Sequence, residues 1–255
     1  MRAHHAVNPI EFEVFKNLYL AIAEEMGVTL CRTGFSPNIK ERLDYSCAVY
    51  DADGETIAQG DHMPVHLGDT HLPDITLVSP VFVPGQKRPS FYVANRAHHS
   101  DVGGMSPGSM PVAREVYQEG LIIPPILLAR RGKIIDDVWQ LILNNVRTPD
   151  EREGDLSAQI AANRVAERRL LEVVKKYGHA RATNYAKALQ DYTERVVQAA
   201  IARIPDGIYE FADALDSDGF GSPPVAIRAT VTIAGNRATV DFTGSAASID
   251  AVNAV

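Results

Sequence analysis

The sequence predicts an α+β fold, in which helices and strands come in separate blocks rather than in alternation. Apolar residues recur every three or four positions near the N-terminus, two strand pairs fall between residues 45 and 97, and the apolar period changes to two after residue 207. We therefore expect mixed or antiparallel sheets, an antiparallel helix pair, an N-terminal helix and a C-terminal β-hairpin region. The expected divisions are an N-terminal α+β domain at 1–150, a helical hairpin at 151–205, and a β-rich segment at 206–255 that begins a further, truncated domain.

The first expected element is a helix over Pro9–Leu30. Asn8 suits the N-cap position, and Pro9 falls at the first helical position, where its missing N–H costs nothing. The spacing of the larger apolar residues predicts one buried face, made of Phe12, Phe15, Leu18, Tyr19, Ile22 and Met26.

Two strand pairs follow this helix. Residues 45–59 predict a β-hairpin, and Ile75–Val83 with Phe91–Ala97 predicts a second, antiparallel pair. In that second pair Asp74 stands at the start of one strand and His98 at the end of its neighbour. We therefore expect these two side chains to lie close together.

The later elements are two helices and three strands. The first helix is expected over Asp155–Tyr177, with Asp155 as its N-cap, and the second over Asn184–Ile204. Their short linkage favours an antiparallel pair. Period-two patterns then predict the three strands Tyr209–Leu215, Val225–Ala234 and Arg237–Phe242.

Composition narrows the classes of function. The 255 residues carry a net charge of −7, which argues against a nucleic-acid groove. Only Cys31 and Cys47 are present, and neither a membrane-spanning run nor the apolar run of a signal peptide is found, so we expect a cytoplasmic protein with no membrane contact. The sequence lacks the common glycine-rich phosphate loops, so ATP is not expected on this chain.

Two short clusters in the first domain carry potential metal ligands. They are His71 with Asp74, and His98, His99 and Asp101. Imidazole and carboxylate together favour a divalent ion, with Zn or Mn expected, and would leave a position open for water or substrate. Neighbours in an extended segment point to opposite faces, so one of His98 and His99 would orient a ligand instead of binding the ion. The alternative is a set of hydrogen-bonded polar loop residues.

Several nearby residues are candidates for proton transfer or for extending the site. Asp101, Glu41 and Asp44 are the candidate proton acceptors, although an ion pair at a helix end is the alternative for Glu41 and Asp44. His62 and His66 could join the site or belong to a plain loop.

Five sequence blocks occur in an order typical of one family. They are Asn38–Ala48, Gln59–Gly68, Thr70–Thr76, Ala94–Gly104 and Asn145–Leu156. Together they resemble the hydantoinase B/oxoprolinase family, which includes N-methylhydantoinase B-type subunits and the large subunits of acetone and acetophenone carboxylases.

The resemblance implies a subunit of an ATP-dependent, metal-assisted hydrolase that opens a cyclic amide such as a hydantoin or 5-oxoproline. It implies a hetero-oligomer with a hydantoinase A-like partner, which carries the ATP. A biotin-independent carboxylase subunit acting on a ketone is the alternative within the family. The positions that match the family's histidine and aspartate motifs are His71, Asp74, His98, His99 and Asp101.

Two departures from the family pattern favour a further alternative. Asp69 alone separates Gly68 from Thr70, where the family has a few tens of residues, and the family extends far beyond the Asp241–Ser245 block. The further alternative is a truncated, non-catalytic scaffold that binds the partner subunit.

Overall fold

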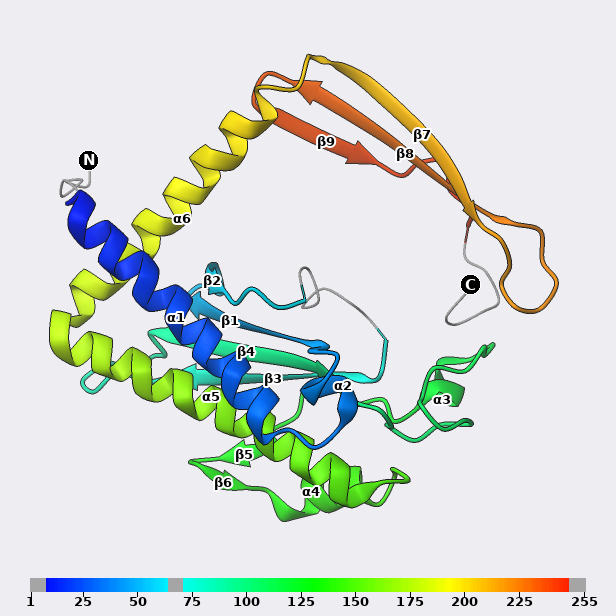
Figure 1. Cartoon of the computed structure of the whole chain (residues 1–255), viewed down its shortest axis with the longest axis horizontal. Coiled ribbons are helices and arrows are strands. Elements are labelled where there is room, and N and C mark those ends of the chain that lie inside the picture. Colours follow the sequence, from blue (N-terminus) through cyan, green and yellow to red (C-terminus); the bar gives the residue numbers. More distant parts are fainter. Residues whose placement is uncertain (1–7, 64–70, 248–255) are drawn as a thin grey trace. The chain divides into compact units, whose positions relative to one another are not determined.

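The computed structural model describes residues 8–63 and 71–247 and confirms the α+β class (Figure 1). Helices are segregated from three antiparallel sheets within these ranges. The described residues of Met1–Val102 and Ile122–Gln190 form one compact unit, and those of Gly103–Leu121 and Asp191–Val255 form a second. The expected divisions at residues 150 and 205 stay predictions.

The first unit is built on a four-stranded antiparallel sheet with the order β2-β1-β4-β3. Its elements are α1 (Pro9–Thr33), α2 (Pro37–Lys40), β1 (Tyr45–Asp51), β2 (Thr56–Gln59), β3 (Asp74–Val81), β4 (Phe91–His98), β5 (Ala129–Arg130), β6 (Lys133–Ile134), α4 (Asp136–Leu143), α5 (Pro149–Tyr177) and the part of α6 (His179–Ile201) up to Gln190. Both predicted strand pairs, 45–59 and 75–97, are confirmed.

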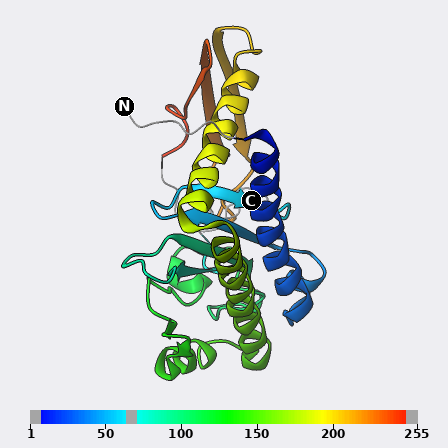
Figure 2. The same ribbon diagram turned by 90° about the vertical axis from the view of Figure 1, so that its left-hand side faces the viewer.

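Helices α1 and α5 pack against each other and cover one face of this sheet (Figures 1 and 2). α1 contacts β1 and β2, while α5 contacts β3 and β4. The predicted apolar face of α1 is buried between them, with Phe15, Tyr19 and Met26 almost fully enclosed. Burying this stripe on a sheet is what stabilises a helix of ordinary propensity.

The predicted start of α1 is confirmed, whereas that of α5 is wrong. The Asn8 Oδ1 accepts hydrogen bonds from the backbone N–H groups of Ile10 and Glu11 at the start of α1. α5 begins at Pro149, so Asp155 lies inside the helix rather than at its N-cap. Proline is favoured at the first helical position, so the helix starts at Pro149 and includes the charged residues that follow it.

The predicted packing of α5 against α6 also differs from the structure. Gly178 alone joins the two helices, with φ of +86°. α5 lies along α1, and the first turns of α6 also contact α1. Among these contacts, the Tyr19 hydroxyl donates to the Ala182 carbonyl at 2.9 Å, and Tyr185 stacks on Phe15. The left-handed backbone at Gly178 redirects the chain, so α6 does not return along α5.

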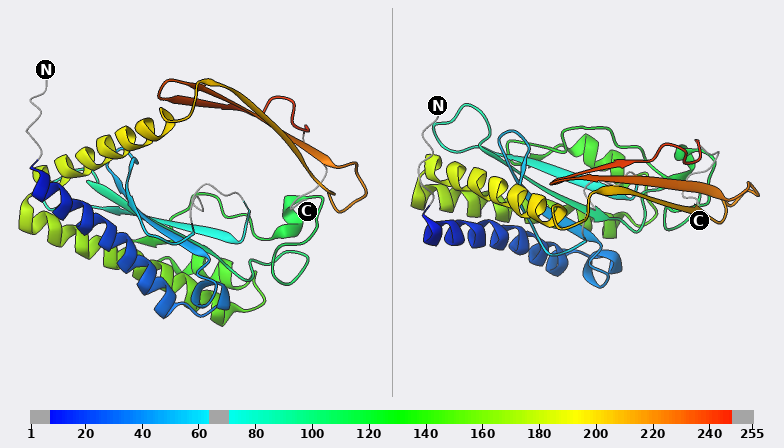
Figure 3. Two further views of the ribbon diagram at one scale, coloured as in Figure 1. Left: turned by 45° about the horizontal axis from the view of Figure 1, so that its top comes forward. Right: turned by 90° about the horizontal axis from the view of Figure 1, so that it is seen from above.

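The second unit contains the antiparallel sheet β7-β8-β9 and confirms the three predicted strands (Figure 3). Its elements are α3 (Val116–Glu119), the end of α6, β7 (Gly207–Leu215), β8 (Val225–Ala234) and β9 (Arg237–Asp241). In the loops, the Arg114 guanidinium lies 4.1 Å from the centre of the Phe220 ring. Alternation along the strands gives one apolar face, on which Phe211 is exposed, and one polar face.

Two further features concern the cysteines and the helices of the described ranges. Cys31 and Cys47 are both free thiols, and Cys47 is buried. No helix there combines the length and the apolar character needed to cross a bilayer.

Gly27 of α1 makes room for the imidazole of His62. A Cβ built on Gly27 would lie 1.9 Å from His62 Nε2. We expect Gly27→Ala to destabilise the protein by about 1–3 kcal/mol, because the added methyl overpacks this contact. In a His62→Ala background the same change should stabilise by up to about 1 kcal/mol, because alanine is the better helix former. Chemical denaturation of the four proteins measures both effects, and an effect of the same sign in both backgrounds would contradict this interpretation.

Candidate metal centre

Three of the five predicted ligands meet at one point. His71 Nε2 and His98 Nδ1 each lie 3.0 Å from the same oxygen of Asp74, Oδ1. The ligand atoms of the three side chains all lie within 4.8 Å of one another, and within the described ranges this is the one such group of three or more. We call His71, Asp74 and His98 the imidazole–carboxylate cluster.

Strand register brings Asp74 and His98 together. β3 and β4 are antiparallel, and Asp74 is directly opposite His98. His71 comes from the turn that leads into β3, where the Asp74 N–H donates to the His71 carbonyl. The predicted meeting of Asp74 with His98 is thus confirmed, since side chains directly opposite on one face are close neighbours.

The cluster lies on the sheet face that α5 does not cover. Along β3, Thr76 and Val78 share the Asp74 face and are exposed, while the residues between them turn toward the helices. The Asp74 side chain is fully buried, whereas His98 keeps 11% and His71 21% of its side-chain surface exposed. The carboxylate is therefore held inside, and the imidazoles remain reachable from solvent.

The donor set and spacing fit a divalent ion. Two neutral imidazoles and one carboxylate suit Zn and similar ions, and atoms about 2.0–2.2 Å from one ion are themselves about 3 Å apart. The N–O separations of 3.0 Å agree with this spacing. Three protein ligands would leave coordination positions open. The same distances also suit two imidazole N–H groups that donate to one carboxylate.

His99 lies outside the cluster and points to α5. Its ring is fully buried, and its Nε2 pairs with Gln159 Oε1 at 2.9 Å. Burial, with the nearby Arg152 guanidinium as a smaller cause, lowers the pKa of His99 to about 4, so the ring is neutral near pH 7. As expected for neighbours in an extended segment, His98 and His99 point to opposite faces, and His98 is the one that joins the cluster.

Asp101 also lies outside the cluster and is bound to Arg147. The Arg147 Nη1 donates to Asp101 Oδ1 at 2.7 Å, and its backbone N–H donates to Asp101 Oδ2 at 2.6 Å. These bonds join the loop after β4 to the loop that precedes α5.

A second set of polar contacts secures the same loop. Arg152 is almost fully buried, donates to the Ser100 hydroxyl at 2.6 Å and pairs with Glu151 and with Asp155, the latter at 2.9 Å. The other Asp155 oxygen accepts the backbone N–H groups of Phe35 and Ser36. This buried network ties the His98–Asp101 segment to α5.

The remaining candidates are placed as follows. Glu41 is exposed at the end of α2, while the Asp44 carbonyl accepts the His98 N–H at 3.0 Å and so lies beside the cluster. His62 pairs instead with Glu24, at 3.7 Å, and burial lowers the pKa of His62. His66 lies outside the described residues.

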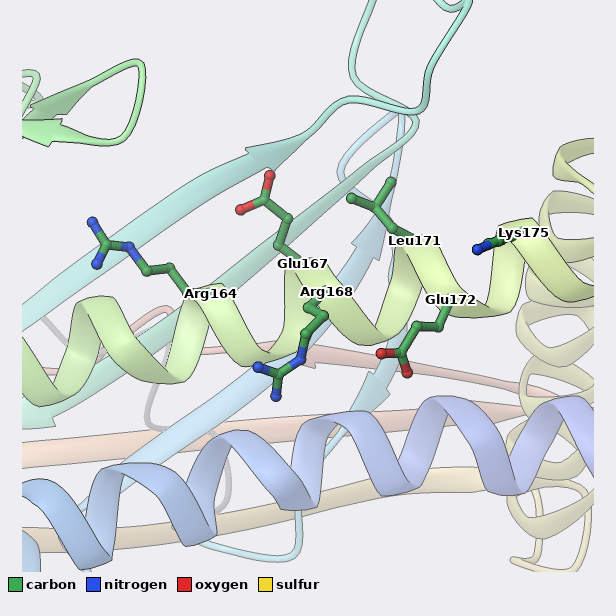
Figure 4. A pocket seen from close by; sticks show the side chains of 6 residues that line it. All are labelled: Arg164, Glu167, Arg168, Leu171, Glu172 and Lys175. Carbon is green, nitrogen blue, oxygen red and sulfur yellow. The ribbon is translucent and has the colours of Figure 1, made fainter.

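A hollow on the surface of α5 lies apart from the cluster. Figure 4 shows it on α5, lined by Arg164, Glu167, Arg168, Leu171, Glu172 and Lys175. It is shallow and contains none of the cluster residues. The chemistry of the donor set, and not this hollow, therefore identifies the candidate site.

Sequence reasoning missed Gln159, Arg147 and Arg152, which lie on α5 and the loop before it. Their partners are His99, Asp101 and Ser100, the residues that follow His98. Gln159 lies inside the helix predicted over Asp155–Tyr177, and Arg152 lies just before it. Polar residues in such a segment are normally solvated. A buried amide or guanidinium is recognisable only when its partners are known, and these partners lie far away in the sequence.

Known proteins resemble this chain over almost its whole length. The model of the Hydantoinase B/oxoprolinase family matches residues 8–70 and 67–255. An uncharacterized protein of Methanocaldococcus jannaschii is 38% identical over 98% of this chain and 50% of its own length. The caprolactamase subunit beta of Pseudomonas jessenii is 32% identical over 92% of this chain and 46% of its own length. The chain spans about half the length of these relatives.

Two solved structures share the fold. The crystal structure of the ATP-dependent caprolactamase from Pseudomonas jessenii matches with a TM-score of 0.83 and 31% identity, over 92% of this chain and 46% of that chain. The nucleotide-free structure of acetone carboxylase also gives a TM-score of 0.83, with 18% identity, over 93% of this chain and 37% of that chain. At that identity the second match shows the fold alone.

Removal of the Asp155 carboxylate should strongly destabilise the protein. Asp155→Ala leaves the Arg152 guanidinium without its fully buried carboxylate partner and two backbone N–H groups unpaired, so we expect a loss of about 3–5 kcal/mol. Arg169→Ala is the control, because Arg169 forms an exposed ion pair with Glu25 and should cost less than about 1 kcal/mol. Urea denaturation measures both, and equal small losses would show that the Arg152 network contributes little.

Proposed function

Because this chain belongs to the hydantoinase B/oxoprolinase family, we propose that it is the B-type subunit of an ATP-dependent hydrolase that opens a cyclic amide. The observation that carries the proposal is the imidazole–carboxylate cluster in a chain 32% identical to a caprolactamase subunit. Caprolactam is a cyclic amide, as are hydantoins and 5-oxoproline, and we propose this class as the substrate. The two free cysteines are in keeping with a reducing compartment such as the cytoplasm.

His71, Asp74 and His98 are the residues that would hold a divalent ion, with Zn or Mn the expected metals. Such an ion would polarise the amide carbonyl or lower the pKa of a bound water. The chain's own contribution is to fix the three donors: the buried Asp74 carboxylate stays in place by strand pairing, and the two imidazoles flank it on the accessible side.

The proton acceptor is a separate part of the proposal. Both oxygens of Asp101 accept hydrogen bonds from Arg147, so we propose that Asp101 fixes the loop rather than moving a proton. Asp44, whose carbonyl binds the His98 N–H, and the exposed Glu41 stay as candidates. Of these, Asp44 has the better position because its backbone adjoins a proposed ligand.

The partner is proposed from the related proteins. One relative is named as a beta subunit, and the solved caprolactamase is described as ATP-dependent. We therefore propose a hetero-oligomer in which a hydantoinase A-like chain binds ATP and activates the substrate.

Metal analysis tests the cluster directly. We expect one divalent ion per chain in the purified protein. His98→Ala and Asp74→Ala should each weaken the affinity for the ion by more than about 100-fold, because losing a residue that only orients a ligand already costs up to about that factor. His179→Ala is the matched histidine control, since His179 starts α6 and lies outside the cluster. If the wild-type protein binds no ion, hydrogen bonds from the two imidazoles to Asp74 would explain why the three side chains lie together.

Reconstitution tests the reaction. Mixed with an ATP-binding A-type subunit, the protein should open caprolactam, 5-oxoproline or a hydantoin only when ATP and the divalent ion are present, and Asp74→Ala should abolish turnover. ATP-dependent fixation of bicarbonate onto a ketone would overturn the hydrolase in favour of the carboxylase. Stable binding of the partner with no turnover of either kind would favour the scaffold.

A further inference from the structure

Gln159 is hydrogen-bonded to the residue that follows Asp74 and to the residue that follows His98. Its Nε2 donates to the Ile75 carbonyl at 2.8 Å, and its Oε1 pairs with His99 Nε2 at 2.9 Å. Ile75 follows Asp74, and His99 follows His98. One fully buried side chain on α5 is therefore bonded next to the two strand-borne members of the cluster.

The direction of these bonds fixes the orientation of His99. Because the Gln159 amide nitrogen donates to a carbonyl, its oxygen is the atom that faces the imidazole, and His99 Nε2 must carry the proton. The backbone N–H of His99 also donates to the Pro73 carbonyl at 2.9 Å. Ring and backbone of His99 are thus held from two sides, and this leaves the adjacent His98 little freedom.

We propose that Gln159 is a positioning residue of the metal centre: acting through His99 and the Ile75 backbone, it sets the distance between the Asp74 and His98 ligand atoms. This inference rests on the proposed function, since it requires that the cluster bind an ion. Its physical basis is that ligands held in the binding geometry before the ion arrives lose less entropy on binding.

Asn163 provides a matched comparison one helical turn along α5. Its Nδ2 donates to the Leu77 carbonyl at 3.1 Å, and its Oδ1 accepts from Asn95 Nδ2 at 2.8 Å. Like Gln159 it is a buried amide that joins α5 to both β3 and β4. Leu77 and Asn95, however, are each three residues from the nearest cluster member. A purely structural role would be the same at both positions.

The experiment compares the affinities of Gln159→Leu and Asn163→Leu full-length chains for Zn²⁺ and Mn²⁺, measured by competition with a chelator. We expect Gln159→Leu to bind about 10–100-fold more weakly than the wild type, and Asn163→Leu to change by less than about threefold. Thermal unfolding of the metal-free proteins should show similar losses for both variants, because each loses comparable buried hydrogen bonds.

A third variant keeps the test decisive if Gln159→Leu does not fold. Gln159→Glu retains an oxygen for His99 but no N–H for the Ile75 carbonyl, so we expect a loss of affinity smaller than that of the leucine variant. Wild-type affinity in the Gln159 variants, or equal losses at Gln159 and Asn163, would overturn the positioning role while leaving the proposed function intact. A wild-type chain that binds neither ion would instead overturn the metal centre itself.

Discussion

The antiparallel register of β3 on β4 is the constraint on which the site depends. It sets Asp74 opposite His98, so that the Asp74 Oδ1 and the His98 Nδ1 lie 3.0 Å apart. No long loop has to be ordered to bring these two atoms together. A slip of one residue would send one of them to the other face of the sheet, because side chains alternate along a strand. The turn before β3 then supplies the third member of the cluster, His71.

Polar contacts on the opposite face of β3 and β4 explain why this register is maintained. Asn95, His99, Gln159 and Asn163 form a buried polar layer between the sheet and α5. Each of these groups would cost free energy if it were buried without partners, so the layer penalises alternative registers. The imidazole–carboxylate cluster therefore lies on the face of the sheet away from α5, and the buried polar layer lies on the face that α5 covers.

Charged and polar contacts hold the loop that follows β4. Asp101 is bound by Arg147, and Ser100 is bound by the buried Arg152, which Asp155 balances. Two candidate ligands suggested by residue type, His99 and Asp101, therefore contact α5 and the loop that precedes it. The family resemblance carried by five sequence blocks is confirmed by the family model. Residues of these blocks form the imidazole–carboxylate cluster and the polar contacts that hold the loop after β4.

The sequence by itself determined the local elements and one half of the site. The period of apolar residues located α1, the strand pairs and β7–β9, and a simple hairpin argument brought Asp74 to His98, because these features depend on neighbours in the sequence. Only the tertiary structure decided that His98 rather than His99 joins the cluster, that Asp101 pairs with Arg147, and that Asp155 is buried inside α5. Those outcomes depend on partners far along the chain, whose positions are set by packing α5 onto the sheet, and no local pattern encodes which polar group will meet which.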